Sequence, residues 1–216
     1  GVHADEFLFV NVGRTDEQKG LDLLVDALAL LQDPRVKIVQ VGDVTDGAAR
    51  SRGLRYGEAL RSKIRSAGLE QQFLWAGWRN DVPLLLQAAN ATVHCARWEG
   101  SPLAVLEAMA AEAAIVTTDN TSRPDGLEHE THGLIAAPDN PAALADAMRT
   151  MSRLPEERRK RLGVAARELA LSRYDSAAVG SQFVDLVESV VTLAKQTTDP
   201  LSVSVCAGSA RTTAGC

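Results

Sequence analysis

The 216-residue chain has few cysteines, few aromatic residues and no excess of positive charge. Its three cysteines, Cys95, Cys206 and Cys216, lack the paired spacing of a disulfide framework, so we expect a reducing, cytosolic setting. The net charge of −5 argues against a nucleic-acid binder or a general membrane-surface binder. No uninterrupted apolar run approaches the roughly 20 residues of a membrane span, and the N-terminus lacks the order of a signal peptide.

The hydrophobic content of 45% is ordinary for a globular protein with a full core. The apolar residues that follow Glu6 already read as a core strand, so the chain begins abruptly. We therefore expect a piece cut from a longer protein.

Short apolar runs alternate with segments of helical periodicity through the first two thirds of the chain. This alternation predicts an α/β fold, a doubly wound parallel sheet covered by helices on both faces. The predicted strands are 7–12, 36–41, 72–76, 91–95 and 115–118, and the predicted helices are 20–31, 58–67, 82–89 and 102–111.

Residues from Pro141 onward read as additional C-terminal helices, over 142–152, 156–171 and 176–196. The last of these carries a broad apolar stripe between Phe183 and Leu193 that needs a covering surface. We expect one domain over 1–196, followed by a disordered tail over 197–216, because the tail is rich in Ser, Thr, Ala and Gly without periodicity.

Ligands of an open parallel sheet bind outside the carboxyl ends of its strands, where polar loops join strands to helices. The first such loop places Arg14 at a strand exit and Lys19 at the next helix start. Together they could form a cationic clamp for a phosphate. The alternative is a solvated loop whose cations pair with Asp16 and Glu17. The loop matches neither a Walker A motif nor a dinucleotide fingerprint.

The second loop leads into a helix that should start at Pro102, with Ser101 as its N-cap. Its first N–H groups would face an anion, with Glu99 just before the helix and Glu107 in its second turn. Gly100 would let the backbone approach a ligand closely. The alternative is an ordinary buried helix with a solvated glutamate at each end.

A third loop, Trp75 to Asp81, is rich in groups that could pack against a flat base. Trp78 and Arg79 are the candidates for that contact. The alternative is that Trp78 simply caps the core.

These motifs together resemble one family, although each alone is weak. The order strand, Gly13-Arg14, Gln18-Lys19-Gly20 and, about 80 residues later, Glu99-x7-Glu107 is similar to the C-terminal, donor-binding domain of GT-B retaining glycosyltransferases of group 1, or family 4. The segments Phe73 to Gly77 and Leu106 to Ala110 also fit that family, whose domain is Rossmann-like.

The resemblance implies a nucleotide-diphosphate-sugar donor, with no other cofactor and no metal. Arg14 and Lys19 would stabilise the leaving diphosphate, Glu99 would bind the transferred sugar, and Glu107 would bind the ribose hydroxyls. The resemblance implies that Arg14, Lys19 and Glu99 would take part in catalysis. The remaining donor-binding candidates are Gly13, Trp78, Arg79, Gly100, Ser101, Glu107 and the N–H groups of Leu103 and Ala104, which would bind the distal phosphate.

The chain departs from the family pattern at two turns. Glu112 and Ala114 stand where the family usually has glycine and proline after the helix of the second glutamate. Thr121 to Asp125 replaces the Gly-Gly-x-Pro-Glu loop, which leaves the wall of the donor pocket and the role of Asp125 open. His129 and His132 lie three apart, but without a further ligand nearby a metal site there is disfavoured.

The resemblance also implies an absent N-terminal domain that binds the unknown acceptor, so this piece alone should be inactive. The full-length protein is expected in the cytoplasm, or at the inner face of the membrane. We also expect homo-association through the stripe of the last helix. Two other functions stay open: a sugar-nucleotide epimerase of similar architecture, and a non-catalytic binding module of this fold.

Overall fold

The computed structural model describes residues 3–43, 50–120 and 123–197. The chain divides into two compact units, Gly1–Tyr174 and Asp175–Cys216. The predicted tail lies outside the described residues beyond 197, as do Cys206 and Cys216.

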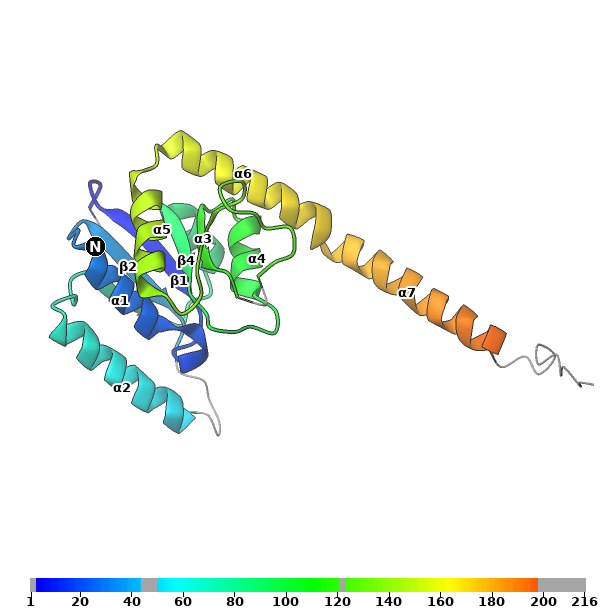
Figure 1. Ribbon diagram of the computed structural model, residues 1–216, viewed down its shortest axis with the longest axis horizontal. Helices are drawn as coiled ribbons and strands as arrows, with labels where there is room; N and C mark the ends of the chain where they lie inside the picture. The colour runs from blue at the N-terminus through cyan, green and yellow to red at the C-terminus, as the bar shows by residue number, and fades with distance from the viewer. Residues whose placement is uncertain (1–2, 44–49, 121–122, 198–216) are drawn as a thin grey trace, which may run out of the picture. The chain divides into compact units, whose positions relative to one another are not determined.

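The first unit is built on a six-stranded parallel sheet with the strand order β3-β2-β1-β4-β5-β6 (Figure 1). The predicted α/β fold is confirmed. Three-residue β6 was missed because its only strand signal is pairing with β5, which a sequence pattern does not reveal. The strands are β1 (Phe7–Val12), β2 (Val36–Val41), β3 (Phe73–Gly77), β4 (Ala91–His94), β5 (Ile115–Thr118) and β6 (Leu134–Ala136).

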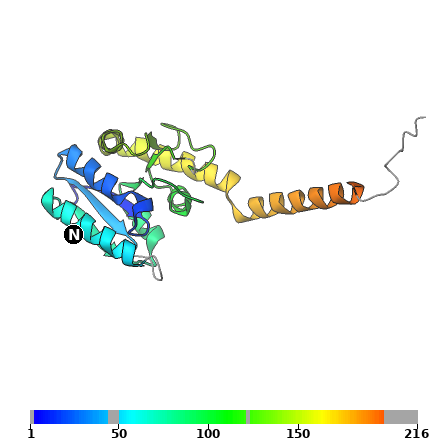
Figure 2. The ribbon, with the colours of Figure 1, turned by 60° about the horizontal axis from the view of Figure 1, so that its bottom comes forward.

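Helices cover both faces of this sheet (Figures 1 and 2). One core joins Phe9, Ile38 and Val93 of the strands to α1, α2 and α5. A second core joins Val10 and Ile115 to α3, α4 and α6 on the opposite face. The helices are η1 (Glu17–Lys19, a 3-10 turn), α1 (Leu21–Leu31), α2 (Arg50–Ser66), α3 (Val82–Ala88), α4 (Leu103–Ala110), α5 (Pro141–Arg153) and α6 (Glu156–Arg173).

Helix α2 begins at Arg50, earlier than the predicted start at residue 58. Gly53 and Gly57 indicate a loop in the sequence, but both are buried in the helix. A Cβ at Gly57 would lie 3.5 Å from the Thr15 methyl group, an ordinary van der Waals contact, so this face of α2 packs close to the loop after β1. Tertiary packing therefore overrides the low helix propensity of glycine here.

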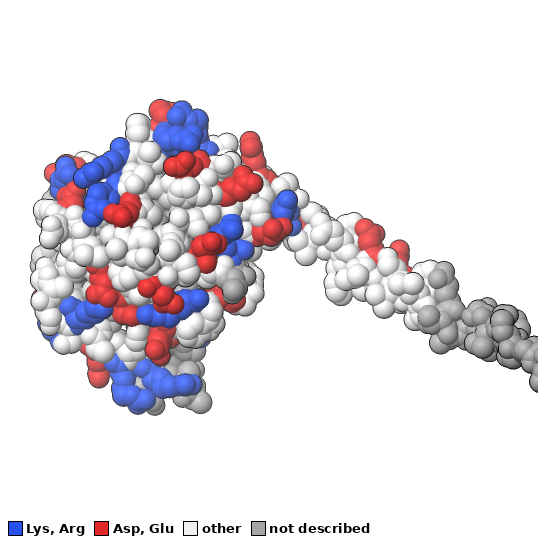
Figure 3. All heavy atoms as spheres, in the orientation of Figure 1, with Lys and Arg blue, Asp and Glu red and all other residues white. Residues whose placement is uncertain are grey.

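The second unit contains α7 (Ser176–Thr197), which carries the predicted apolar stripe. Its charged residues are Asp185, Glu188 and Lys195, and Figure 3 shows it as largely uncharged. The helical stretch Glu156–Lys195 includes an 18-residue window with a mean hydropathy of 1.3. By length and composition alone this window could cross a membrane, a test that core helices of soluble proteins also pass.

Candidate functional site

The loops that follow β1 and β4 meet at the carboxyl edge of the sheet. These neighbouring strands lead to crossovers in opposite directions, so their ends form the topological switch point where open α/β sheets bind ligands. The Arg97 N–H donates to the Gln18 carbonyl oxygen (2.8 Å), and the Gln18 side chain donates to the Trp98 carbonyl oxygen (2.9 Å). The two loops therefore form one surface.

Gly20 sets how closely the two loops approach. Its φ of 64° is left-handed, and a Cβ there would lie 2.3 Å from the Cys95 carbonyl oxygen. The Cys95 thiol in turn donates to the carbonyl oxygens of Lys19 and Gly20, each at 3.3 Å. Only glycine satisfies both the backbone angle and the contact. The Gln-Lys-Gly element thus has a steric reason for its glycine.

Lys19 and Glu99 form a largely buried ion pair at this edge. Lys19 Nζ lies 2.5 Å from Glu99 Oε1, and the side chains are only 15% and 6% exposed. Gln18 donates to the other carboxylate oxygen at 3.4 Å, and His94 Nε2 lies 3.2 Å from Oε1. Burial raises the pKa of Glu99, but the hydrogen bonds of His94 and Lys19 outweigh it, so the pKa lies below its ordinary value.

Arg14 lies on the same loop but is half-exposed. It pairs with Asp16 at 3.2 Å and donates to Gln18 Oε1 at 3.0 Å. The solvated-loop alternative is therefore right in its pairing for Arg14, and it is wrong for Lys19, which pairs with Glu99. Beside Arg14 is a pocket of about 270 Å³, lined by residues that include Gln18, Arg52, Tyr56 and Trp98.

The start of α4 differs from the prediction. The helix begins at Leu103, with Pro102 at the N-cap and no side-chain cap bond, so Ser101 is not the cap. Pro102 has a ψ of 64°, outside the helical range, and the Leu103 N–H donates to the Ser101 carbonyl oxygen at 2.9 Å. Leu103 N–H is thus occupied, whereas the Ala104 N–H has no acceptor among the described residues.

Glu107 stands in the second turn of α4, as predicted, and its side chain is exposed. Within the described part of the chain the Glu107 side chain makes neither a hydrogen bond nor an ion pair. Gly100 lies in the loop before α4, where a Cβ would meet nothing within 4 Å. The backbone at Gly100 therefore borders open space rather than packed protein.

Trp78 follows β3 and is 75% exposed, so the alternative in which it caps the core is wrong. Arg79 forms a two-bond pair with Asp81 at 2.8 and 2.6 Å. Strand β2 separates β3 from β1 in the sheet, so this loop lies at the end of a strand that is not itself part of the switch point. The Gly42 N–H, at the end of β2, donates to the Gly77 carbonyl oxygen at 2.8 Å and so ties the loop to the neighbouring strand end.

The sequence did not reveal a second charged cluster beside the two loops, in which Asp22 contacts Arg97 and Tyr56. Arg97 donates two hydrogen bonds to Asp22 (2.8 and 2.7 Å), and the Tyr56 hydroxyl donates to Asp22 Oδ1 (2.7 Å). Burial opposes ionisation of Asp22, but these donors lower its pKa to about 2. The only sequence signal was an arginine next to Trp98 in the second loop, because Asp22 and Tyr56 are distant in the chain.

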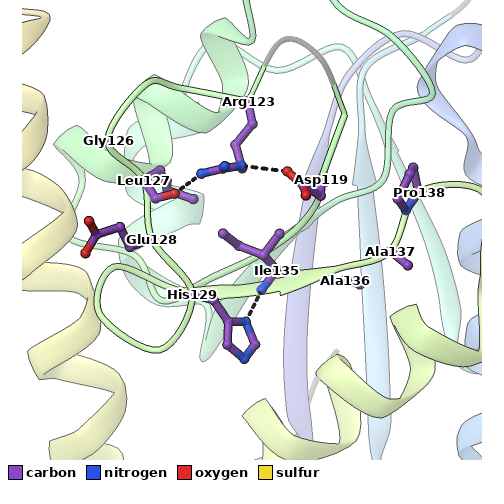
Figure 4. A pocket seen from close by; sticks show the side chains of 10 residues that line it. All are labelled: Asp119, Arg123, Gly126, Leu127, Glu128, His129, Ile135, Ala136, Ala137 and Pro138. Carbon is purple, nitrogen blue, oxygen red and sulfur yellow. Dashed lines mark hydrogen bonds and ion pairs between the residues drawn. The ribbon is translucent and has the colours of Figure 1, made fainter.

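A larger pocket, of about 660 Å³, opens at the carboxyl ends of β5 and β6 (Figure 4). Arg123 crosses its wall, pairing with Asp119 at 3.0 Å and donating to the Leu127 carbonyl oxygen. Apolar groups including Ile135 and Pro138 complete the lining. The neighbouring Asn120 donates to the Ala96 carbonyl oxygen (3.0 Å), which links this wall to the loop of Glu99.

The two histidines near this pocket serve the backbone. His129 Nδ1 accepts the Ile135 N–H at 2.9 Å, and His132 Nδ1 accepts the Glu128 N–H at 3.1 Å. Both ring nitrogens therefore stabilise the turn that leads into β6. Among the described residues, no three His, Cys, Asp or Glu side chains are grouped so that they could hold a metal ion.

The departures from the family pattern have structural outcomes. Glu112 adopts a φ of 58°, the left-handed conformation that glycine would take without strain, so the turn is retained. Asp125 pairs with Arg173 of α6 at 2.5 Å and accepts the Tyr174 hydroxyl on its carbonyl oxygen at 3.0 Å. Asp125 is thus tied to α6. Thr121 and Ser122 lie outside the described residues.

Known proteins resemble this chain over most of its length. The family model described as "Glycosyl transferases group 1" matches residues 1–169. A lipopolysaccharide core biosynthesis mannosyltransferase of Rhizobium meliloti is 35% identical over 138 residues, which are 62% of this chain and 38% of that protein. A phosphatidyl-myo-inositol mannosyltransferase of Mycobacterium leprae is 32% identical, over 84% of this chain and 46% of that protein. The chain thus spans less than half the length of these relatives.

Solved structures share the fold. The Anabaena protein Alr3699/HepE, crystallised in complex with UDP-glucose, superposes with a TM-score of 0.77 at 25% identity. That superposition covers 86% of this chain and 50% of the Anabaena chain. The C-terminal domain of a group 1 glycosyl transferase from Francisella tularensis has a TM-score of 0.68 at 22% identity, covering 79% of this chain and 87% of that domain.

Proposed function

The chain belongs to the group 1 glycosyltransferases, and from this premise we propose that it is the donor-binding domain of a retaining enzyme. It binds a nucleotide-diphosphate sugar at the switch point between β1 and β4. The full-length protein transfers the sugar to an acceptor held by an N-terminal domain that precedes this chain. The single observation that carries the proposal is the buried Lys19–Glu99 pair at the meeting point of the two loops.

The placement of charge supports binding of the diphosphate without a metal. Lys19 and Arg14 lie on one loop, and the Ala104 N–H is at the beginning of α4, where the helix dipole favours an anion. Negative charge builds on the leaving diphosphate as the glycosidic bond breaks. Fixed cations and N–H donors therefore stabilise the transition state more than the ground state.

The two glutamates are suited to hydroxyl recognition. An ionised carboxylate only accepts hydrogen bonds, and the vicinal hydroxyls of a sugar or a ribose are donors. The lowered pKa of Glu99 keeps it ionised near neutral pH. Glu107, exposed and without a protein partner in the described part of the chain, is available to a ligand. We assign Glu99 to the sugar and Glu107 to the ribose.

Calorimetric titration of the 216-residue chain with UDP, UDP-glucose, GDP and GDP-mannose tests the proposal. We expect one nucleotide family to bind. Lys19→Ala should weaken that binding about 10- to 100-fold, because a charge-assisted hydrogen bond contributes about 1.5–3 kcal/mol. The matched control is Lys37→Ala, which removes another largely buried lysine, paired with Glu6 at 3.1 Å near the amino edge of the sheet.

Glu107→Ala should also weaken binding, whereas removal of another exposed helical glutamate, Glu157→Ala in α6, should not. Binding of none of the four ligands by the wild-type chain, or equal effects of the site and control variants, would contradict the proposal. Incubation of the chain with the sugar nucleotide that it binds, without an acceptor, distinguishes a transferase from the epimerase alternative. An epimerase would release an altered sugar nucleotide, and a transferase would not.

A further inference from the structure

His94 is the last residue of β4 and is 5% exposed. Its Nε2 atom lies 3.2 Å from Glu99 Oε1, the same oxygen that Lys19 Nζ approaches. The loop of residues 95–98 therefore turns back so that the carboxylate of Glu99 meets the strand from which the loop left. No motif in the sequence drew attention to this histidine.

The hydrogen-bond partners of His94 indicate which ring nitrogen carries the hydrogen. An ionised Glu99 can only accept, so Nε2 must carry the hydrogen that lies between the two groups. His94 Nδ1 is buried and has no partner among the described residues. A neutral ring leaves one lone pair unsatisfied there, whereas a charged ring would bury an unsatisfied N–H and a charge, which costs more. The ring is thus a neutral donor directed at Glu99.

We propose that His94 is a positioning residue of the donor site, which holds the Glu99 carboxylate in place for the sugar hydroxyls. The inference rests on the proposed function. Lys19 then has two anionic partners, Glu99 and the donor diphosphate, and a bound donor draws Lys19 away from Glu99. The hydrogen bond from Gln18 to Glu99 is long, at 3.4 Å. The neutral His94 N–H is not attracted by the diphosphate and continues to fix Glu99.

A positioning role for His94 predicts a selective effect on ligand binding, which a residue that only stabilises the fold would not have. Glu99 serves the sugar, so His94 acts through Glu99 on the sugar half of the donor alone. A nucleoside diphosphate without a sugar binds through the cations, the α4 N–H group and Glu107. Loss of His94 should therefore weaken binding of the sugar nucleotide and leave binding of the nucleoside diphosphate unchanged.

The test is calorimetry of the 216-residue chain with UDP and UDP-glucose, or with GDP and GDP-mannose if the wild type binds that pair. His94→Leu removes the donor at similar size, and His94→Gln returns an N–H near the position of Nε2. We expect His94→Leu to lose about tenfold in affinity for the sugar nucleotide, the equivalent of one hydrogen bond, with unchanged affinity for the diphosphate. His94→Gln should recover most of the loss.

If His94→Leu binds both ligands equally more weakly than wild type, His94 is only a structural residue and the proposal is overturned. Unchanged affinity for both ligands would also overturn it. If His94→Leu fails to fold, His94→Asn, whose amide is too short to reach Glu99, gives the same comparison. A wild-type chain that binds neither pair defeats the proposed function and this role together. A wild-type chain that binds, with no selective loss in the histidine variants, defeats the role of His94 alone.

Discussion

Arg97 on the loop after β4 and Asp22 in the first turn of α1 are joined by two hydrogen bonds, at 2.8 and 2.7 Å. Arg97 also donates to the Glu17 carbonyl oxygen (2.9 Å) and pairs with Asp139 (3.0 Å) before α5. One guanidinium on the loop that leads to Glu99 thus connects three other segments of the chain. Its fork geometry suits this role, because Arg presents several donors in fixed directions.

We expect the stability of the protein to depend on pH through the Asp22 carboxyl. Its pKa is about 2 in the folded protein and 3.8 ordinarily, so its contribution is complete above pH 3.8 and is lost as the pH falls towards 2. This shift corresponds to about 2 kcal/mol. Urea unfolding should find Asp22→Asn less stable than wild type by about that amount at pH 7, with the difference shrinking below pH 4. A difference that stays constant with pH would contradict the assignment.

Arg97→Ala leaves a partly buried Asp22 without its main partner. We expect a loss of roughly 2–3 kcal/mol in the free energy of unfolding. The matched control is Arg35→Ala, because Arg35 makes the same two-bond fork to Asp33 (3.0 and 2.8 Å) on an exposed turn. That exposed pair should contribute less than about 1 kcal/mol. Chemical denaturation of both variants is the measurement, and similar losses would refute the burial argument.

Gly20 and Gly68 have nearly the same φ angle but different surroundings. Alanine at each position therefore distinguishes the cost of a steric contact from the cost of the left-handed backbone. A Cβ at Gly20 (φ 64°) would meet the Cys95 carbonyl oxygen, whereas a Cβ at Gly68 (φ 69°) would meet nothing within 4 Å. Gly68→Ala should cost about 1 kcal/mol from the left-handed backbone alone. Gly20→Ala should cost clearly more, or prevent folding, because the loops must separate. Equal thermal midpoints for the two variants would be inconsistent with the close approach.

We expect the substitution of Glu112 by glycine to stabilise the protein. Its φ of 58° strains a residue with a Cβ, and its ion pair with Arg167 is a long 3.6 Å contact on the surface. Glu112→Gly should raise the free energy of unfolding by about 0.5–1 kcal/mol. Glu112→Ala, which keeps the Cβ, should bring no such gain. Urea denaturation distinguishes these outcomes, and a gain from alanine as large as that from glycine would point to a cause other than the backbone.

The periodicity of the sequence was sufficient for strands β1 to β5 and for most helices, since buried parallel strands read as short apolar runs whatever their neighbours are. It failed at the first turns of α2, where Gly53 and Gly57 indicate a loop but packing imposes a helix. It failed again at α4, where the torsion of Pro102 postpones the helix by one residue. The first error arises because local propensity is small compared with tertiary contacts, and the second arises from the backbone torsion of a single residue at the helix start.

The sequence by itself determined the α/β class, the family resemblance and the two loops that form the candidate site, because all three follow from residue patterns within short segments. Only the tertiary structure decided that Lys19 pairs with Glu99, that His94 faces the same carboxylate, and that Arg97 reaches Asp22. Lys19 and Glu99 are 80 positions apart, and their distance depends on strand order and on the close approach at Gly20. Those relationships arise from packing of the whole sheet, which no local pattern encodes.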